Sequence, residues 1–252
     1  MKFLTLCLLF VSSFALANPI DTKCPQHVIW GAPIVVDGNN QYLCKSGYAI
    51  EYSYTNKVAD YVVETITAQH IAVKNAGRKD DFREDPEVPA QFRATLSDYT
   101  GAGLDRGHMA PAANFVYDAK VMSESFYLTN MMPQAPGNNR GIWKYLEEYT
   151  RVWANKYGQV YVITGTLFDK DSKVMGANKV KVPSFVYKIV IEPKSGKTIA
   201  FMFPNEKLDP KTINDYTLPV AELEQYTRIN FSPALPAALK NSEQIKGNMK
   251  DW

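Results

Sequence analysis

Three short segments in the middle of the chain carry the residue types that hydrolysis of a phosphodiester bond requires. That reaction needs a base to deprotonate water, a cation to offset charge on the phosphate, and a way to stabilise the departing 3′ oxygen. In chain order, the segments are Leu104-Asp105-Arg106-Gly107-His108-Met109-Ala110-Pro111, Tyr127-Leu128-Thr129-Asn130-Met131-Met132-Pro133-Gln134 and Asn138-Asn139-Arg140-Gly141-Ile142-Trp143-Lys144-Tyr145-Leu146-Glu147. One tetrapeptide such as Asp-Arg-Gly-His is a weak signal, but three segments in this order are a much stronger one.

His108 is the candidate base, and Arg106 is the candidate phosphate contact. An unperturbed histidine has a pKa of about 6.5, so a neutral imidazole is available near neutral pH. Arg106 precedes His108 by two positions, and on an extended strand both side chains would project from one face. A guanidinium can donate to two phosphate oxygens and stays charged. Alternation along the strand would turn Asp105 to the opposite face, so we interpret Asp105 as structural. The alternatives are a structural histidine and a surface ion pair of Arg106 with Asp105.

Asn139 lies at the entrance of an expected amphipathic helix. Its apolar residues recur at three- and four-residue spacing and are Ile142, Tyr145, Leu146, Tyr149, Val152 and Trp153. Asn139 is either the N-cap of this helix or, with Asn138 as the cap, an oxygen ligand for a hard cation beside a phosphate. Magnesium often takes only one or two protein ligands, so a single Asn is chemically reasonable. Glu147 follows two turns later and either orients water around the cation or is a solvated helix carboxylate.

The rest of the chain predicts one mixed α+β domain with a mainly antiparallel central sheet flanked by helices. Aromatic and β-branched residues predict a hairpin over 48–54 and 59–67, and later strands over 159–168, 184–191 and 198–203. A second helix is expected from Leu218 or Pro219 through Tyr226. The segment after Pro236 fits either a surface helix or a loose tail.

The first 17 residues have the pattern of an export signal. Lys2 supplies the positive start, residues 3–14 are almost wholly apolar, and Ala15-Leu16-Ala17 is a small-x-small cleavage site. No later segment is long and apolar enough to cross a bilayer. We therefore expect a single mature domain, 18–252, in a periplasm or outside the cell.

Export to an oxidising compartment predicts a disulfide between Cys24 and Cys44, because Cys7 lies in the segment to be removed. Closing that loop would contribute on the order of 3 kcal/mol. A zinc site is the alternative, but two cysteines and His27 do not supply four ligands at a recognisable spacing.

The formal net charge of +2 does not by itself indicate a nucleic-acid binder. Local basic residues precede the first segment and could form a phosphate-contacting rim: Lys74, Arg78, Lys79, Arg83 and Arg93. Five acidic residues between positions 80 and 87 are interleaved with them, so charge alone favours a solvated surface.

The ordered motifs, taken together, resemble those of the DNA/RNA non-specific endonucleases. The matching positions are Asp105-Arg106-Gly107-His108, Asn130 with Pro133-Gln134, and Asn139-x-Gly141-x-Trp143-x-x-Leu146-Glu147. Arg78 with Phe82 and Asp85-Pro86 is similar to an upstream basic motif of the family, and Val220-Ala221-Glu222-Leu223-Glu224 through Phe231 and Pro233 is similar to its late helix. The resemblance extends from about position 49 to 236.

This resemblance implies a ββα-metal (His-Me) finger that hydrolyses DNA and RNA through one Mg²⁺, or another divalent ion such as Mn²⁺, and leaves 5′-phosphate products. It implies His108 as general base, Asn139 as metal ligand, Arg106 as transition-state contact and Glu147 as organiser of metal-bound water. Asn130 would support the site.

Arg78, or Arg83 in its place where the motif spacing is loose, would bind substrate phosphate, and Arg140 is a further candidate. The alternative is a catalytically inactive exported binding protein on the same fold, which predicts loss of the base or the metal ligand. A two-metal phosphodiesterase acting on small substrates would need a cluster of carboxylates and histidines that the sequence does not show.

Overall fold

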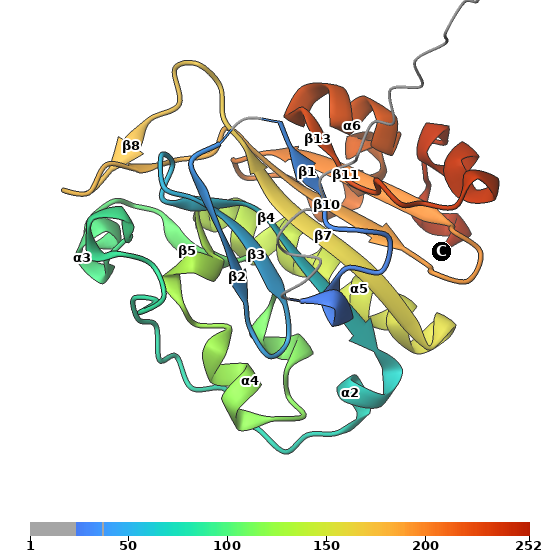
Figure 1. Ribbon diagram of the computed structural model, residues 1–252, viewed down its shortest axis with the longest axis horizontal. Helices are drawn as coiled ribbons and strands as arrows, with labels where there is room; N and C mark the ends of the chain where they lie inside the picture. Colours follow the sequence, from blue (N-terminus) through green and yellow to red (C-terminus); the bar gives the residue numbers. More distant parts are fainter. Residues whose placement is uncertain (1–23, 37) are drawn as a thin grey trace, which may run out of the picture.

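A computed structural model of the chain describes residues 24–36 and 38–252, so the predicted export signal lies outside the described residues. Its centre is a seven-stranded sheet in the order β12-β11-β10-β7-β4-β3-β2 (Figure 1). Every neighbouring pair is antiparallel, which confirms the expected mixed α+β fold. The strands are β2 Asn40–Cys44, β3 Ala49–Ser53, β4 Val58–Thr67, β7 Gln159–Leu167, β10 Phe185–Ile191, β11 Thr198–Pro204 and β12 Thr217–Leu218.

The predicted hairpin and the three later strands are present, with ends that agree to within one or two residues. These strands are rich in β-branched and aromatic residues, whose side chains pack well on a pleated surface. Strand β2 was not predicted, because its NQYLC sequence has no alternating apolar pattern. It pairs with β3 at the edge of the sheet.

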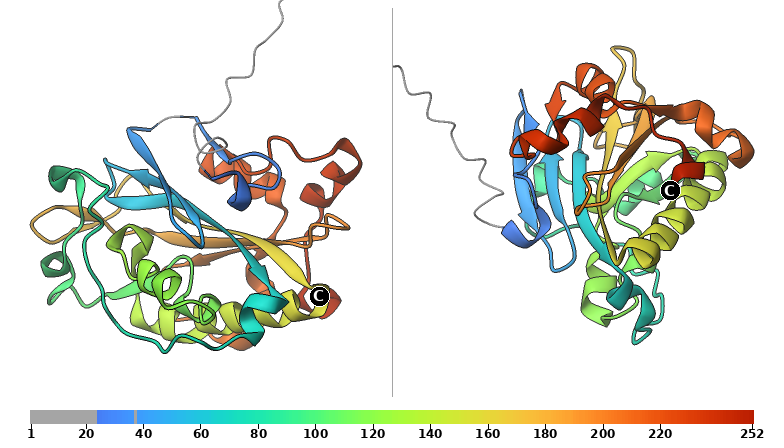
Figure 2. Two further views of the ribbon diagram at one scale, coloured as in Figure 1. Left: turned by 60° about the horizontal axis from the view of Figure 1, so that its bottom comes forward. Right: turned by 90° about the vertical axis from the view of Figure 1, so that its right-hand side faces the viewer.

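Side chains on the two faces of the sheet belong to two separate hydrophobic clusters. Helix α5, Lys144–Tyr157, packs through Leu146 and Trp153 into the cluster on one face. Helix α6, Val220–Thr227, packs through Val220 and Leu223 into the cluster on the other. Figure 2 shows the sheet between these two layers. The α6 bounds confirm the second predicted helix, and Pro219 is its N-cap residue.

Shorter elements complete the chain. Before the central segments they are η1 Pro25–His27, β1 Ile34–Val35, α2 Ala68–Ala72, η2 Ala90–Phe92 and α3 Leu96–Tyr99. In the middle they are β5 Asp105–His108, η3 Ala112–Asn114, α4 Ala119–Glu124, η4 Leu128–Asn130, β6 Met131–Gln134 and η5 Asn138–Trp143. After β7 they are β8 Val174–Met175, β9 Val180–Lys181, η6 Pro210–Tyr216, β13 Ile229–Asn230, η7 Ala237–Gln244 and η8 Met249–Asp251. The segment after Pro236 is thus partly helical rather than a loose tail.

The predicted disulfide joins Cys24 to Cys44, with a Cα–Cα distance of 5.7 Å. It fastens the start of the described chain to β2 and removes the zinc alternative. His27 lies beside this bridge, where its Nε2 atom is 3.1 Å from the Lys45 carbonyl oxygen. His70 stacks on Tyr117 with ring centroids 4.0 Å apart. Neither histidine lines the cavity that His108 lines. Among the described residues, no helix has the length and apolar character needed to span a membrane.

Candidate active site

The three motif segments fold into one strand-strand-helix unit. Strand β5 pairs antiparallel with β6, so that Asp105 faces Gln134 and His108 faces Met131. The chain then passes through η5 into α5. Gly107 permits this close pairing, because a Cβ atom there would lie 2.0 Å from Gln134 Oε1 and 2.8 Å from Gln134 Cβ. The unit therefore brings β5 close to the turn before α5, although the two segments are about 30 positions apart in the sequence.

The turn that precedes α5 differs from the sequence prediction. Residues Asn138–Trp143 form a π-helical turn with a break at Gly141 (φ −107°, ψ −111°), and the regular helix begins only at Lys144. Neither Asn139 nor Asn138 is a helix N-cap. The Asn138 side chain instead accepts from Gln134 Nε2 (2.7 Å) and donates to the Pro204 carbonyl (3.0 Å), which fixes the turn against the end of β11. Because Asn139 caps neither helical segment, the N-cap interpretation is removed and the metal-ligand interpretation remains.

His108 is 8% exposed and lies against aromatic rings. Its ring centroid is 5.0 Å from that of Phe126 and 5.7 Å from that of Phe82. The Nε2 atom is buried and has no hydrogen-bond partner within the described chain. Burial, and then the positive charge of Arg78, lower the pKa of His108 to about 3. The imidazole is consequently neutral near neutral pH, with one nitrogen available to accept a proton.

Asn130 supports the segment after His108 without reaching the hollow. Its Oδ1 accepts from Ala110 N (3.0 Å), and its Nδ2 donates to the carbonyls of Ala110 (2.9 Å) and Ser125 (2.8 Å). The side chain is fully buried. Asn130 is thus a positioning residue that holds the segment after His108 in place.

Asp105 has a larger role than the structural one expected from strand alternation. Its Oδ2 accepts from Asn139 Nδ2 at 2.8 Å, and Arg140 donates to both carboxylate oxygens at 2.8 and 2.6 Å. Burial opposes ionisation, but the hydrogen bonds from Arg140 and Asn139 hold the pKa of Asp105 below its ordinary value. Because the Asn139 nitrogen faces Asp105, the amide oxygen of Asn139 is left without a partner in the part of the chain that the structure describes.

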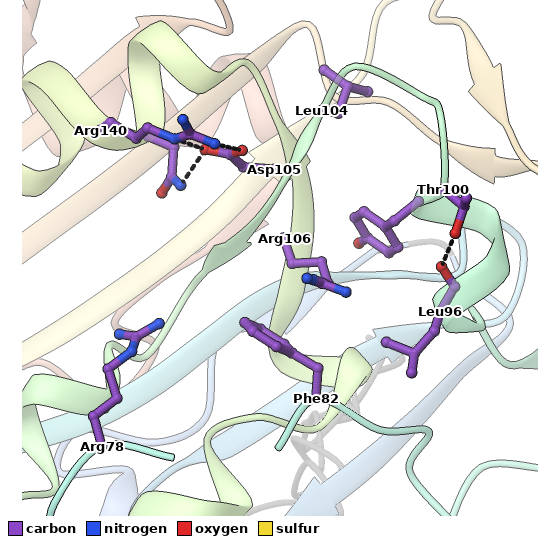
Figure 3. A pocket seen from close by; sticks show the side chains of 10 residues that line it. Arg78, Phe82, Leu96, Thr100, Leu104, Asp105, Arg106 and Arg140 are labelled. Carbon is purple, nitrogen blue, oxygen red and sulfur yellow. Dashed lines mark hydrogen bonds and ion pairs between the residues drawn. The ribbon is translucent and has the colours of Figure 1, made fainter. Parts of the chain in front are cut away.

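Two adjoining hollows open at this unit. The first, which we call the histidine-side hollow, has a volume of about 290 Å³ and is lined by residues that include His108, Glu147 and Arg151. The second, the loop-side hollow of about 430 Å³, is lined by Asp105 and by residues of the segment around α3 (Figure 3). Both are lined by Arg78, Arg106, Asn139 and Arg140. His108 and Asn139 therefore line the same hollow.

The candidate arginines are not equivalent. The Arg106 guanidinium lies 4.3 Å from the Phe82 ring centroid, and within the described residues it has no ion pair with a carboxylate. Arg78 makes an exposed ion pair with Asp80 (2.7 Å) and lines both hollows. The Arg140 side chain is 73% exposed at the rim, where it pairs with Asp105.

Arg83 lies outside both hollows. It pairs with Asp81 (3.0 Å), donates to the Ser123 carbonyl (2.9 Å) and covers the Tyr127 ring at 4.1 Å. Of these two candidates for phosphate binding, Arg78 lines the hollows and Arg83 does not.

Glu147 lies on the first turn of α5 and faces the histidine-side hollow. Burial raises the pKa of Glu147 to about 7, against the opposing effects of Lys188 and Arg151. Arg151 follows one helical turn later, lines the same hollow, and donates to Asn114 Oδ1 at 3.3 Å. Sequence reasoning missed Arg151, although its four-residue spacing from Glu147 places both on one helix face.

Charged side chains on the underlying sheet were also missed. Lys188 of β10 donates to Thr164 Oγ1 (2.5 Å) and to the Met109 carbonyl (3.5 Å), next to His108 in the chain. Glu64 of β4 accepts both hydrogen bonds from Asn114 Nδ2, at 3.1 and 3.0 Å. Burial lowers the pKa of Lys188 and raises that of Glu64. A polar network thus extends beneath the site from the sheet.

Arg78→Gln is expected to raise the pKa of His108, because the positive charge of Arg78 disfavours protonation of the imidazole. The chain has only three histidines, so NMR titration can follow each ring separately. Arg78→Lys is the matched control, since it keeps the charge and should leave the titration of His108 near that of the unaltered protein. An unchanged His108 titration in Arg78→Gln would show that Arg78 does not act on this imidazole.

A histidine on the first strand of a strand-strand-helix unit, with an asparagine just ahead of the helix, defines the ββα-metal class of nucleases. The model of the DNA/RNA non-specific endonuclease family matches residues 33–238. Nuclease C1 of Cunninghamella echinulata var. echinulata is 37% identical over 207 residues, covering 75% of this chain and 82% of the relative. Mitochondrial endonuclease G of Homo sapiens is 34% identical over 227 residues, covering 84% and 76%.

The fold comparison agrees with the sequence comparison. A crystal structure of an EndoG/EndoGI complex, described as showing the mechanism of EndoG inhibition, matches with a TM-score of 0.76 and 31% identity. The match covers 84% of this chain and 91% of that one. The chain belongs to the DNA/RNA non-specific endonuclease family.

Proposed function

We propose that this nuclease cleaves phosphodiester bonds of both DNA and RNA with one divalent cation, and that His108 is the general base. The observation that carries the proposal is the shared lining of the histidine-side hollow by His108, Arg106 and Asn139. A phosphate where this hollow meets the loop-side hollow can face a neutral imidazole, an arginine that has no carboxylate partner among the described residues, and an amide oxygen.

The oxygen donors suit a hard cation. Asn139 Oδ1 is held away from Asp105 by the hydrogen bond of Nδ2, and Glu147 faces the same hollow. Within residues 24–36 and 38–252, no group of three or more His, Cys, Asp or Glu side chains could hold a metal. Magnesium commonly takes one or two protein oxygens and keeps several waters, so these donors fit Mg²⁺, with Mn²⁺ as an alternative. When bound, such an ion offsets negative charge on the phosphate and on the departing oxygen.

The side chains have separable tasks in the reaction. His108 Nε2 accepts a proton from water, whose oxygen attacks phosphorus. Arg106 binds phosphate oxygens, and Arg78 with Arg140 adds positive charge at the rim. Glu147, carrying a carboxylate above pH 7, accepts hydrogen bonds from water in the hollow. The P–O3′ bond breaks and the departing 3′ oxygen takes up a proton from solvent water, so the phosphate stays on the 5′ oxygen of the downstream product.

Incubation of the protein with plasmid DNA and with RNA, each with and without EDTA, tests this proposal directly. Both substrates should be cut internally in the presence of Mg²⁺ and neither after chelation. Contacts through phosphates predict a rate that falls steeply with salt and varies little with base sequence. Cleavage that persists in EDTA, or a cleavage map with a strict recognition sequence, would contradict it.

Asp105→Ala is expected to raise the Mg²⁺ concentration for half-maximal activity by about tenfold or more, within the usual effect of losing a partner that orients a metal ligand. Without Asp105, Asn139 Nδ2 loses its acceptor and the amide can rotate. Arg140→Ala removes the ion pair but keeps that hydrogen bond, so its Mg²⁺ titration should stay near that of the unaltered protein. Similar titrations of both variants and the unaltered protein would refute the orienting role.

We also propose export to a periplasm or the extracellular medium after cleavage near Ala17. The apolar residues 3–14 and the Ala15-Leu16-Ala17 site support it. The Cys24–Cys44 disulfide supports an oxidising compartment. Mass spectrometry of the exported protein should find Asn18 as the first residue, and retention of the first 17 residues would contradict the proposal.

A further inference from the structure

We propose that the loop-side hollow binds the sugar and base of the nucleotide on the 5′ side of the cleaved phosphate. This inference rests on the function proposed above, because it takes the phosphate to lie where the two hollows meet. Their shared residues are Arg78, Arg106, Asn139 and Arg140.

The two hollows differ in what lies beyond the shared residues. His108 lines the histidine-side hollow, whereas Leu96, Tyr99 and Leu104 line the loop-side hollow. A phosphate at the junction therefore has the His108 imidazole on one side and, on the other, a wall formed by Leu96, Tyr99 and Leu104. Figure 3 shows Leu104 at the top and Leu96 at the lower right of the loop-side hollow, with Arg106 above the Phe82 ring.

Three arginines and the side chains of Leu96 and Leu104 line the loop-side hollow, a combination that suits the phosphate, sugar and base of one nucleotide. Leu96 is 41% exposed, which leaves an apolar surface facing the hollow. The Arg106 guanidinium stacked on Phe82 offers a flat cationic face. Bases stack on aromatic and arginine faces, and this contact tolerates any base sequence. The volume of about 430 Å³ lies within the range of small-molecule sites.

The wall is also held rigidly by residues outside the site. Asp98 is 1% exposed and accepts from Thr95 N at 2.7 Å, which caps helix α3. Asn178, in the turn between β8 and β9, donates to Asp98 through its backbone N (3.0 Å) and its Nδ2 (2.9 Å). Gly176 permits this approach, because a Cβ atom there would lie 2.2 Å from Asp98 Oδ1. A wall ordered before binding loses little entropy when a nucleoside packs on it.

The direction of the strand follows from the geometry of displacement at phosphorus. The attacking water and the leaving oxygen lie roughly in line on opposite sides of the phosphorus. Water activated by His108 enters from the histidine-side hollow, so the 3′ oxygen departs toward the loop-side hollow. That oxygen belongs to the nucleotide on the 5′ side, whose sugar and base then lie against Leu96, Tyr99 and Leu104.

Oligothymidylates in which every linkage but one is a methylphosphonate have a single cleavable phosphodiester bond. Their cleavage tests the assignment. One substrate carries an abasic residue 5′ of the cleavable linkage and another carries it 3′ of the linkage. The 5′ abasic residue should lower kcat/KM by about tenfold, in line with the usual contribution of base stacking, and the 3′ abasic residue should have a much smaller effect. Equal losses, or a larger loss on the 3′ side, would overturn the assignment.

The double variant Leu96→Ala with Leu104→Ala should cut the intact substrate more slowly. It should also lose most of the 5′ abasic penalty, which is the decrease in kcat/KM that the abasic residue on the 5′ side causes. Ile245→Ala, at a residue 61% exposed and outside both hollows, is the matched control and should keep that penalty. A penalty that stays in full in the double variant would overturn the role of the wall.

Binding of thymidine 3′-phosphate to the metal-free protein, followed by calorimetry, gives a second readout that needs no cleavage. It should bind about tenfold more tightly than inorganic phosphate, and the double variant should lose that advantage. Equal affinities in the unaltered protein would overturn the subsite. If thymidine 3′-phosphate binds more tightly than inorganic phosphate but the protein cleaves no substrate, the subsite is supported and the proposed function is refuted. If the protein cleaves its substrates but binds the two ligands equally, the proposed function is supported and the subsite is refuted.

Discussion

His108→Ala is expected to lower kcat for DNA cleavage at least about 100-fold, which is the lower range for loss of a general base. The Nε2 atom that would accept the proton from water is removed. Affinity for DNA should change little, because the proposed phosphate contacts come from Arg78, Arg106 and Arg140, which line the hollow. Single-turnover cleavage and DNA binding measured in Ca²⁺ separate the two effects.

His70→Ala is the matched control, since His70 lies on α2 and stacks on Tyr117 outside both hollows. It should cleave at nearly the unaltered rate. If His108→Ala also kept that rate while remaining folded by circular dichroism, the base would have to be another group.

Asn139→Ala is expected to abolish activity at ordinary Mg²⁺ concentrations and to raise the Mg²⁺ concentration for half-maximal activity by about tenfold to 100-fold or more, because the amide oxygen of Asn139 is the proposed metal ligand. The fold should persist, since the side chain makes one hydrogen bond, to Asp105. Titration of activity with Mg²⁺ and with Mn²⁺ measures the change.

Asn138→Ala provides a contrast at the neighbouring position. Its side chain is buried and fixes the turn through Gln134 and Pro204. Loss of those bonds should lower the free energy of unfolding by roughly 1–3 kcal/mol through unpaired buried groups. Its Mg²⁺ titration should shift less than that of Asn139→Ala. An unchanged metal titration in Asn139→Ala would contradict the ligand assignment.

Much of this arrangement could be predicted from the sequence because the signals are local. The strands of the sheet have dense β-branched and aromatic residues, and α5 and α6 have apolar residues at helical spacing. Cys24 and Cys44 could be paired because they are the two cysteines that remain once the predicted export signal with Cys7 is removed. The order of the motifs around His108 and Asn139 identified the family before the fold was known.

Other features depend on contacts that no local pattern encodes. Alternation along β5 wrongly assigned Asp105 to a purely structural role, because it could not show that the turn before α5 returns to meet this carboxylate. The π-helical turn of η5 likewise contradicts the simple N-cap expectation. Arg83 and Arg78 have similar sequence surroundings, and only the fold separates them.

The sequence does contain a signal for the buried charges of the sheet. Lys188 interrupts the apolar strand FVYKIVI, and Glu64 interrupts the apolar strand β4. A charge in the middle of such a strand predicts a buried polar partner, because an unpaired buried charge is costly. The partners themselves depend on the fold. Lys188 meets Thr164 because of the strand register, and Glu64 meets Asn114 because of the path of the chain after His108.

A crystal structure of the His108→Ala variant with a short DNA duplex and Mg²⁺ tests the central claim most directly. We predict one phosphate at the junction of the two hollows, contacted by Arg106 and by a metal ion bound to the Asn139 amide oxygen, with the space of the missing imidazole on the opposite side of the phosphorus. DNA bound at another face, or a metal ion remote from Asn139, would contradict the account.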